Sequence, residues 1–212
     1  MAGSAWSLRN AISELVLGEL IHIDVKKLGR IHQGAGKRIT GIKRNPRRTR
    51  RDAEGHDRKI IGWEYVHVCI DDATRLAYVE VLADEKAVTA VGFLCRAIAH
   101  FASYGITTER VITDNSGAYR SSVHAIACRT LRVRHLRTRP YRPQTNGNAE
   151  RFIRTLLAGW AYGAIYRSSE ERAAALAGWL DFYNRRRPHG ALSHKPPIAR
   201  LNDQNNLLRS YS

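Results

Sequence analysis

Cysteine and long apolar runs are scarce in this chain of 212 residues, and each shortage excludes a class of protein. The three cysteines, Cys69, Cys95 and Cys128, are odd in number and widely spaced, with no Cys-x-x-Cys pair. A disulfide framework and a cysteine-pair zinc finger are therefore unsupported, and we expect all three in the core. No apolar run approaches the roughly 20 residues that span a membrane, and the first residues do not resemble a signal peptide. We expect a cytoplasmic protein without membrane contact.

Acidic residues are also few: 19 Asp and Glu stand against 35 Lys and Arg, a net charge of +16. Such an excess favours phosphate-rich partners, because binding releases the counterions of a polyanion. Nucleic acid is the preferred partner. The alternatives are a soluble protein that is merely basic, or one attracted to an anionic membrane surface. The hydrophobic fraction of 43% is enough for the core of one domain.

Most of the excess charge lies between residues 26 and 59, which hold thirteen Lys or Arg and three acids. Five glycines and Pro46 interrupt this segment. We interpret 26–59 as a basic loop insertion, or an extended hairpin, that becomes ordered on a polyanion. The alternative is a solvated insertion that contacts nothing.

The hydrophobic pattern predicts an α/β fold, a five-stranded mixed sheet flanked by helices. The second half alternates strands and helices, which implies parallel strands there. Asp84 is expected to cap the first helix and Gly105 to end it. We expect an amino-terminal extension over 1–18, a core over 19–201 and a tail over 202–212. The expected strands are 20–25, 63–70, 76–82, 110–113 and 131–136, and the expected helices are 88–101, 121–130, 146–165 and 169–184.

Three carboxylates occupy suggestive positions. Asp24 and Asp114 end predicted strands, and Glu150 lies in the first turn of a predicted helix with a polar face. If the two strands are neighbours, Asp24 and Asp114 meet at one edge of the sheet. Carboxylates that close repel one another unless a cation lies between them, and Mg²⁺ or Mn²⁺ prefers such oxygen ligands. Two ions held there can support in-line displacement at phosphorus.

Other readings compete with this one. A single Asp after a strand is commonly a turn or cap residue. Asp71 and Asp72 form a rival pair, but Arg75 beside them indicates a hairpin turn. We expect His22 to point away from Asp24, to the opposite face of its strand, and to serve in packing.

Five segments in order carry a family resemblance. They are His22–Asp24, Ile70–Arg75, Thr113–Asn115, Arg142–Arg151 and Tyr183–Leu192, and 35 residues separate Asp114 from Glu150. Together these segments resemble the catalytic core of bacterial insertion-sequence transposases of the retroviral-integrase type, the DDE superfamily. The resemblance runs from about Glu19 to Leu201.

This resemblance implies a ribonuclease H-like fold and a DNA transposase or integrase, active as a homo-oligomer on DNA, that cleaves and transfers strands at transposon ends. It makes Asp24, Asp114 and Glu150 the catalytic residues and the ligands of two Mg²⁺ or Mn²⁺ ions. Two departures stand out: Gly117 is one position later than usual after the second aspartate, and eighteen residues before the first strand are too few for an end-reading helix-turn-helix region. A ribonuclease H-like nuclease and a truncated, non-catalytic DNA-binding remnant are the alternatives.

Basic and polar residues around these segments are expected to contact DNA. Some of these residues could instead have a purely structural role. Asn146 could cap a helix, Tyr141 could pack on a proline, and Arg151 and Arg154 could pair with side chains four residues away on the same helix. The basic cluster of Arg185, Arg186, Arg187 and His189 would equally suit a helix carboxyl end. The expected DNA-binding residues are Lys26, Lys27, Arg139, Tyr141, Arg142, Asn146, Asn148, Arg151 and Arg154.

Overall fold

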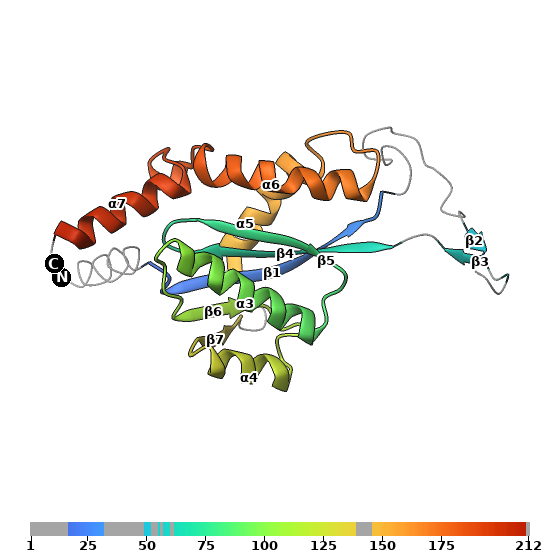
Figure 1. Cartoon of the computed structure of the whole chain (residues 1–212), viewed down its shortest axis with the longest axis horizontal. Coiled ribbons are helices and arrows are strands. Elements are labelled where there is room, and N and C mark those ends of the chain that lie inside the picture. Colours follow the sequence, from blue (N-terminus) through green and yellow to red (C-terminus); the bar gives the residue numbers. More distant parts are fainter. Residues whose placement is uncertain are drawn as a thin grey trace, which may run out of the picture.

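A five-stranded mixed sheet forms the centre of the molecule (Figure 1). The computed structural model describes residues 17–31, 49–51, 55, 57–59, 62–138 and 146–210. The strand order is β5-β4-β1-β6-β7, in which β4 and β5 run antiparallel to their neighbours and β6 and β7 run parallel to β1. The mixed sheet and its parallel second half are therefore confirmed. The strands are β1 Leu20–Gly29, β4 Trp63–Asp71, β5 Ala77–Leu82, β6 Arg110–Thr113 and β7 Arg134–Arg137.

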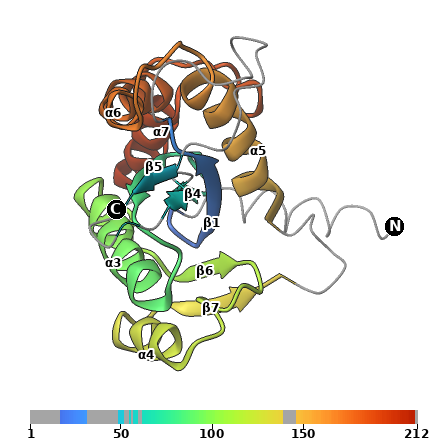
Figure 2. The same ribbon diagram turned by 90° about the vertical axis from the view of Figure 1, so that its right-hand side faces the viewer.

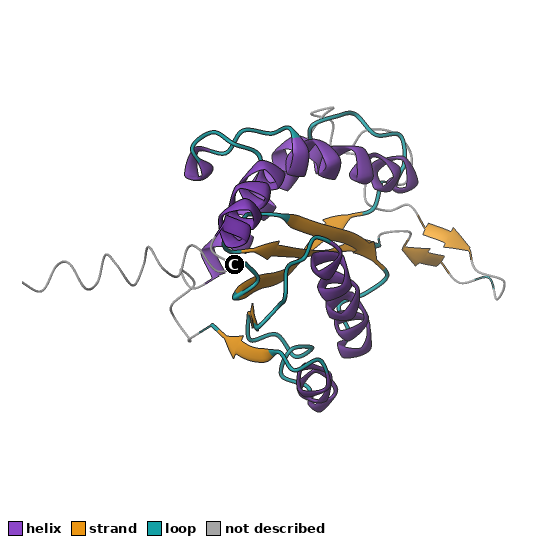
Figure 3. Ribbon diagram, turned by 60° about the vertical axis from the view of Figure 1, so that its left-hand side comes forward, coloured by secondary structure: helices purple, strands orange, loops and turns teal. Residues whose placement is uncertain are grey.

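Helices cover both faces of the sheet (Figures 2 and 3). One face carries α3 (Ala87–Ser103) and α4 (Ser122–Thr130). The other carries α5 (Gly147–Leu156), its π-helical extension Leu157–Ala161, and α6 (Ser169–Arg185). A 3₁₀ turn, Gly190–Leu192, leads to α7 (Pro197–Ser210). Within the described residues no helix is long and apolar enough to cross a bilayer.

β1 divides the core into two clusters, because successive side chains of a strand point to opposite faces. Ile21 and Ile23 pack in one cluster with Phe93 of α3. Leu28 packs in the other with Phe152 of α5. Odd-numbered residues of β1 therefore face α3, and even-numbered residues face α5.

β1 is longer than predicted. It pairs with β4 without interruption from Ile21↔Asp71 to Gly29↔Trp63, so Asp24 lies within the strand and not at its end. Lys26 and Lys27 consequently belong to the strand and not to the basic loop. Two short strands of the basic segment, β2 (Thr49–Arg51) and β3 (Asp57–Lys59), pair antiparallel; residues 32–48 lie outside the described residues.

Smaller predictions also needed correction. β7 begins at Arg134, because a turn through Arg132, with φ of 57°, precedes it. The helix expected over 146–165 changes at Leu156 into the π-helical turn. α7 occupies most of the expected tail. Asp84 lies two residues before the N-cap of α3, where it accepts hydrogen bonds from Lys86 N and Thr89 Oγ1. Cys95 is exposed, unlike the other two cysteines.

The turn after β4 is built by its two aspartates, as predicted. Asp71 is buried and accepts hydrogen bonds from Gly18 N at 3.2 Å and from the backbone and hydroxyl of Thr74 at 2.8 and 2.7 Å. Arg75 lies in the left-handed region at φ 63° and donates to Asp72 Oδ1 at 2.7 Å. Asp71 and Asp72 are therefore structural partners of this turn.

Asn184 fastens α6 to the edge of the sheet. Its Oδ1 accepts from Ala77 N and its Nδ2 donates to Ala77 O, both at 2.9 Å. The side chain thus takes the place of a neighbouring strand at the start of β5. Asn184 is 7% exposed, so these bonds are sheltered from water.

We predict that Asn184→Ala destabilises the fold by about 2–4 kcal/mol, because two buried backbone groups of Ala77 lose their partners. Denaturant unfolding measures the change. Asn202→Ala, an exposed position on α7, is the matched control and should shift stability by less than about 0.5 kcal/mol. Equal effects of the two substitutions would contradict this role.

Candidate active site

The pairing of β1 with β6 brings Asp24 and Asp114 to the same level of the sheet. His22 pairs with Ile112 in this parallel ladder. Asp24 lies two residues after His22, and Asp114 lies two residues after Ile112. Residues two apart along a strand point to the same face. The register of β1 and β6 is therefore consistent with Asp24 and Asp114 lying side by side.

Asn146 fixes the start of α5 against the same stretch of β1. His22 Nδ1 lies 3.0 Å from Asn146 Oδ1, and Asn146 Nδ2 donates to Ile23 O at 3.3 Å. Asn146 is 4% exposed, and although it is the N-cap residue its side chain makes no capping bond. The capping alternative is therefore wrong: Asn146 joins the helix to the strand, and Glu150 follows one helical turn later.

His22 faces the same side of β1 as Asp24, not the opposite one. Its ring contacts Asn146 at the start of α5, and its Nε2 lies 3.4 Å from Asp72 Oδ1. The two residues are two apart in an uninterrupted strand, which places them on one face. His22 is 4% exposed, so this contact is sheltered from water.

The three acids act on one another electrostatically. Burial raises the pKa of Asp24 to about 6, and the negative charges of Asp114 and Glu150 raise it as well. A hydrogen bond from Val25 N and the charge of Lys26 oppose that rise. An ionised Asp24 is thus costly here without a nearby cation.

The donor set fits a hard divalent cation. All three groups offer carboxylate oxygen, the ligand that Mg²⁺ and Mn²⁺ prefer, and their mutual repulsion is what a cation would relieve. Their oxygen atoms do not all lie within 4.8 Å of one another among the described residues. The three carboxylates are therefore too far apart to share one ion without moving. Glu150 is exposed to solvent.

The segment after Asp114 forms its turn without help from Gly117. Ser116 N donates to Asp114 Oδ1 at 2.9 Å, and Asn115 Nδ2 donates to Thr138 O at 2.7 Å. Gly117 does not have positive φ, and a Cβ there would meet no atom within 4 Å. The displaced glycine therefore imposes no requirement on the turn beside Asp114.

The expected DNA-binding residues are distributed unevenly. Lys26 is exposed on the face of Asp24, whereas Lys27 lies on the other face, paired with Glu85 and 5.4 Å from the centre of the Tyr65 ring. Asn148 donates to Asp72. Arg151 and Arg154 are exposed and form no ion pair with any described residue. Arg139, Tyr141 and Arg142 lie outside the described residues.

A basic pocket of about 270 Å³ lies between α5, the glutamate helix that carries Glu150, and the closing segment, Tyr183–Leu192. Arg187 stacks near the Tyr183 ring at 5.9 Å, and His189 meets the same ring edge-on. Sequence reasoning placed Arg187 and Arg151 in separate groups; the shared Tyr183–Phe152 contact brings those groups together. The polar and charged lining residues are Arg75, Asn148, Arg151, Thr155, Arg187 and His189.

Two family models match this chain. A model of the integrase core domain matches residues 18–143, and a second model with the same description matches 131–197. The chain belongs to the integrase core domain family. The two matches together contain all three acids and the whole segment Tyr183–Leu192.

The chain is also similar to individual proteins over part of its length. The chain is 32% identical over 133 residues to an uncharacterised protein of Caenorhabditis elegans, matching 63% of this chain and 10% of that protein. It is 27% identical over 86 residues to an uncharacterised protein of insertion element IS136 of Agrobacterium fabrum, matching 41% of this chain and 44% of that protein. The chain thus spans only part of the curated relatives that it matches.

Solved integrases share the fold. A chain of the simian T-cell lymphotropic virus intasome, solved in complex with a PP2A regulatory subunit, has a TM-score of 0.61 at 19% identity over 88% of this chain and 55% of that one. The catalytic core domain of BIV integrase has a TM-score of 0.56 at 17% identity over 92% of this chain and 99% of that one. These similarities establish the ribonuclease H-like fold of the core.

We predict that Asp24→Asn stabilises the metal-free protein at pH 7.5. The pKa of Asp24 in the folded state, about 6, exceeds the ordinary value of 3.8. The free energy of unfolding is therefore undiminished below pH 3.8 and falls as the pH rises from there through 6. The substitution should recover roughly 1–3 kcal/mol at pH 7.5 and nothing below pH 4. Thermal unfolding across pH measures this. An Asn variant less stable than the parent at pH 7.5 would contradict the repulsion.

We also predict that Gly117→Ala leaves the melting temperature within about 2 °C of the parent, since the new Cβ meets nothing. Gly18→Ala is the matched comparison: Gly18 has φ of 74°, and its Cβ would lie 2.1 Å from Thr107 O. That variant should lose several kcal/mol or fail to fold. A large loss in Gly117→Ala would restore the importance of the displaced glycine.

Proposed function

We propose that this chain is the catalytic core of a DNA transposase, which cleaves DNA at the ends of a mobile element and joins them to target DNA. The proposal is supported by the β1–β6 register, by the charges of Asp114 and Glu150 that act on Asp24, and by the match to the integrase core domain. Relatives support this reading, since one belongs to an insertion element and another is an intracisternal A-particle Pol-related polyprotein.

In this proposal Asp24, Asp114 and Glu150 hold two Mg²⁺ or Mn²⁺ ions. When bound, such ions activate the attacking oxygen and stabilise the leaving oxygen of a displacement at phosphorus. Asn146 and His22 position the glutamate helix against β1. Lys26, exposed on the same face as Asp24, attracts phosphate toward the acids.

The DNA path runs over α5 and the basic pocket. Arg151 and Arg154 project from α5 without ion-pair partners among the described residues, and Arg187 lines the pocket beside Arg151. Backbone phosphate is the ligand that such arginines suit, since a guanidinium binds it through two parallel hydrogen bonds. Action as a homo-oligomer on DNA is part of the proposal, and the intasome similarity supports it.

Two other functions remain distinct outcomes. A nuclease with the same fold would hydrolyse DNA or RNA without joining ends. A non-catalytic remnant would bind DNA without metal-dependent cleavage. A strand-transfer assay with a labelled 3′-OH end separates them, because only a transposase covalently joins the label to a second DNA molecule.

We predict that Asp114→Asn reduces Mg²⁺-dependent nicking and strand transfer by at least about 10³-fold, because a ligand carboxylate becomes a neutral amide. DNA binding and its salt dependence should remain. Glu109→Gln, which neutralises an exposed acid just before β6, is the control and should retain activity. Nicking in Mg²⁺ that survives Asp114→Asn would overturn the metal-site assignment.

We predict that Arg187→Ala weakens DNA binding uniformly across sequences and lowers the slope of log K against log salt by about 1, the loss of one phosphate contact. Arg186→Ala is the matched control, since the neighbouring Arg186 is exposed and pairs with Asp181 at 3.3 Å. Its slope should stay unchanged. An unaltered slope in Arg187→Ala would remove the pocket from the DNA path.

A further inference from the structure

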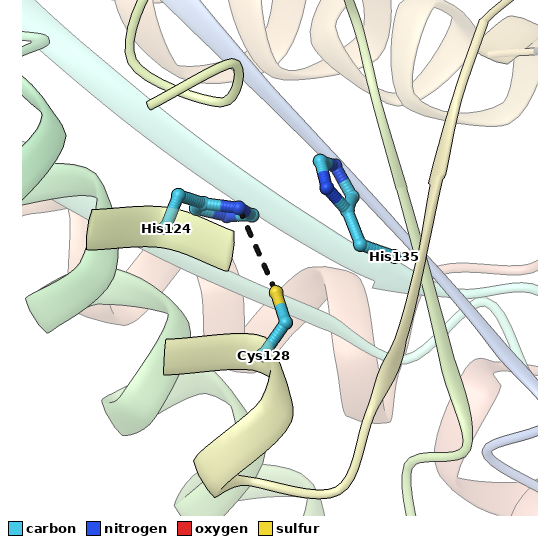
Figure 4. A group of neighbouring side chains, drawn as sticks. All are labelled: His124, Cys128 and His135. Atoms are coloured by element: carbon cyan, nitrogen blue, oxygen red, sulfur yellow. Dashed lines mark hydrogen bonds between the residues drawn. The ribbon is translucent and has the colours of Figure 1, made fainter. Parts of the chain in front are cut away.

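A cluster of histidine and cysteine side chains, residue types that commonly bind metal ions, lies between α4 and β7 (Figure 4). His124 and Cys128 are four residues apart on α4 and therefore share one face of that helix. His135 approaches them from β7, with its ring toward His124. One ligand atom from each residue lies within 4.8 Å of the other two, and within the described residues this is the one group of three that does so.

The spacing suits a tetrahedral ion. His124 Nδ1 and Cys128 Sγ are 3.6 Å apart. Zinc binds sulfur at about 2.3 Å and imidazole nitrogen at about 2.0–2.1 Å, which places two such ligands about 3.5 Å apart at a tetrahedral angle. The two α4 side chains thus already have the separation of zinc ligands.

His135 is held in the orientation that metal-binding histidines need. Its Nε2 lies 2.8 Å from Thr113 Oγ1, and the Thr113 hydroxyl donates to Asp114 O at 3.0 Å. Since that hydroxyl has given its hydrogen to the carbonyl, it accepts from His135 Nε2–H. His135 Nδ1 then keeps its lone pair, as in metal sites where the second ring nitrogen donates to an outer partner.

Burial favours the ligand forms of the histidines. His124 is 0% exposed, and its Nε2 has no hydrogen-bond partner. Burial, and then the neighbouring His135, lower the pKa of His124 to about 4, so the imidazole is neutral near pH 7. Burial raises the pKa of the Cys128 thiol to about 11, so the bare cluster holds one thiol proton.

We propose that His124, Cys128 and His135 bind one Zn²⁺ ion, with a water molecule as fourth ligand. Binding replaces the Cys128 thiol proton, which leaves to solvent, and forms a zinc–thiolate bond without any change of oxidation state. The soft sulfur and nitrogen ligands distinguish this site from the carboxylate site, whose oxygen ligands favour Mg²⁺ or Mn²⁺.

The site would join three elements of the parallel half of the sheet. α4 contributes two ligands and β7 one, and His135 continues through Thr113 to the backbone of Asp114. A bound zinc would therefore fix α4 on β6 and β7 and hold the backbone next to the second acid.

Cobalt tests the proposal directly, because a cysteine thiolate bound to Co²⁺ gives a charge-transfer absorption in the near ultraviolet. The chelator-treated full chain, titrated with Co²⁺, should develop this band with one equivalent, and Zn²⁺ should abolish it. Cys128→Ser should lose the band, whereas Cys95→Ser, at an exposed cysteine of α3, should keep it. Asp114→Asn should also keep it, which separates this site from the acids.

Circular dichroism shows which variants are folded, and His135→Gln gives a second test if Cys128→Ser does not fold. Thermal unfolding adds a readout independent of colour: Zn²⁺ should raise the melting temperature of the parent and not that of the folded variants lacking a ligand. A folded parent without the band, or a band that persists in Cys128→Ser, would overturn the proposal.

Discussion

Everything at the candidate active site depends on how β1 is held. Its parallel pairing with β6 sets Asp24 level with Asp114, and Asn146 attaches α5 to the face of β1 that carries Asp24, through His22 and Ile23. Three negative charges are thereby kept close to a partly buried position against their mutual repulsion. The packing of the rest of the sheet offsets the free-energy cost of this repulsion, and in the proposed function a divalent cation would relieve it.

The closing segment shows how one stretch of sequence serves both structure and chemistry. Asn184 satisfies the backbone of Ala77, while Tyr183 packs against Phe152 and carries Arg187 over its ring. The guanidinium therefore reaches the pocket beside Arg151 only because its neighbours fix the turn after α6. The segment Tyr183–Leu192 thus holds α6 to the sheet through Asn184 and places Arg187 in the basic pocket.

Sequence reasoning predicted the sheet and most of the helices, because hydrophobic periodicity is a local feature. Its choice of Asp24, Asp114 and Glu150 as metal ligands stays a prediction. It predicted β1 too short, because Lys26 and Lys27 do not look like strand residues. Their place in the strand comes from the pairing with β4. It missed α7, whose run from Asn202 to Asn206 looks unlike a helix. The contact between Asn146 and His22 joins residues that are distant in sequence, so no local pattern reveals it. The approach of His135 to His124 and Cys128 depends on how β7 lies beside α4.

The central claim is that Asp24, Asp114 and Glu150 bind divalent cations. Anomalous X-ray scattering from crystals of the full chain soaked in Mn²⁺ tests it most directly. The account predicts manganese peaks between these carboxylates, with ligand distances of about 2.1–2.2 Å, and their loss in Asp114→Asn crystals. Peaks elsewhere only, or an acid cluster without manganese at saturating concentration, would contradict it.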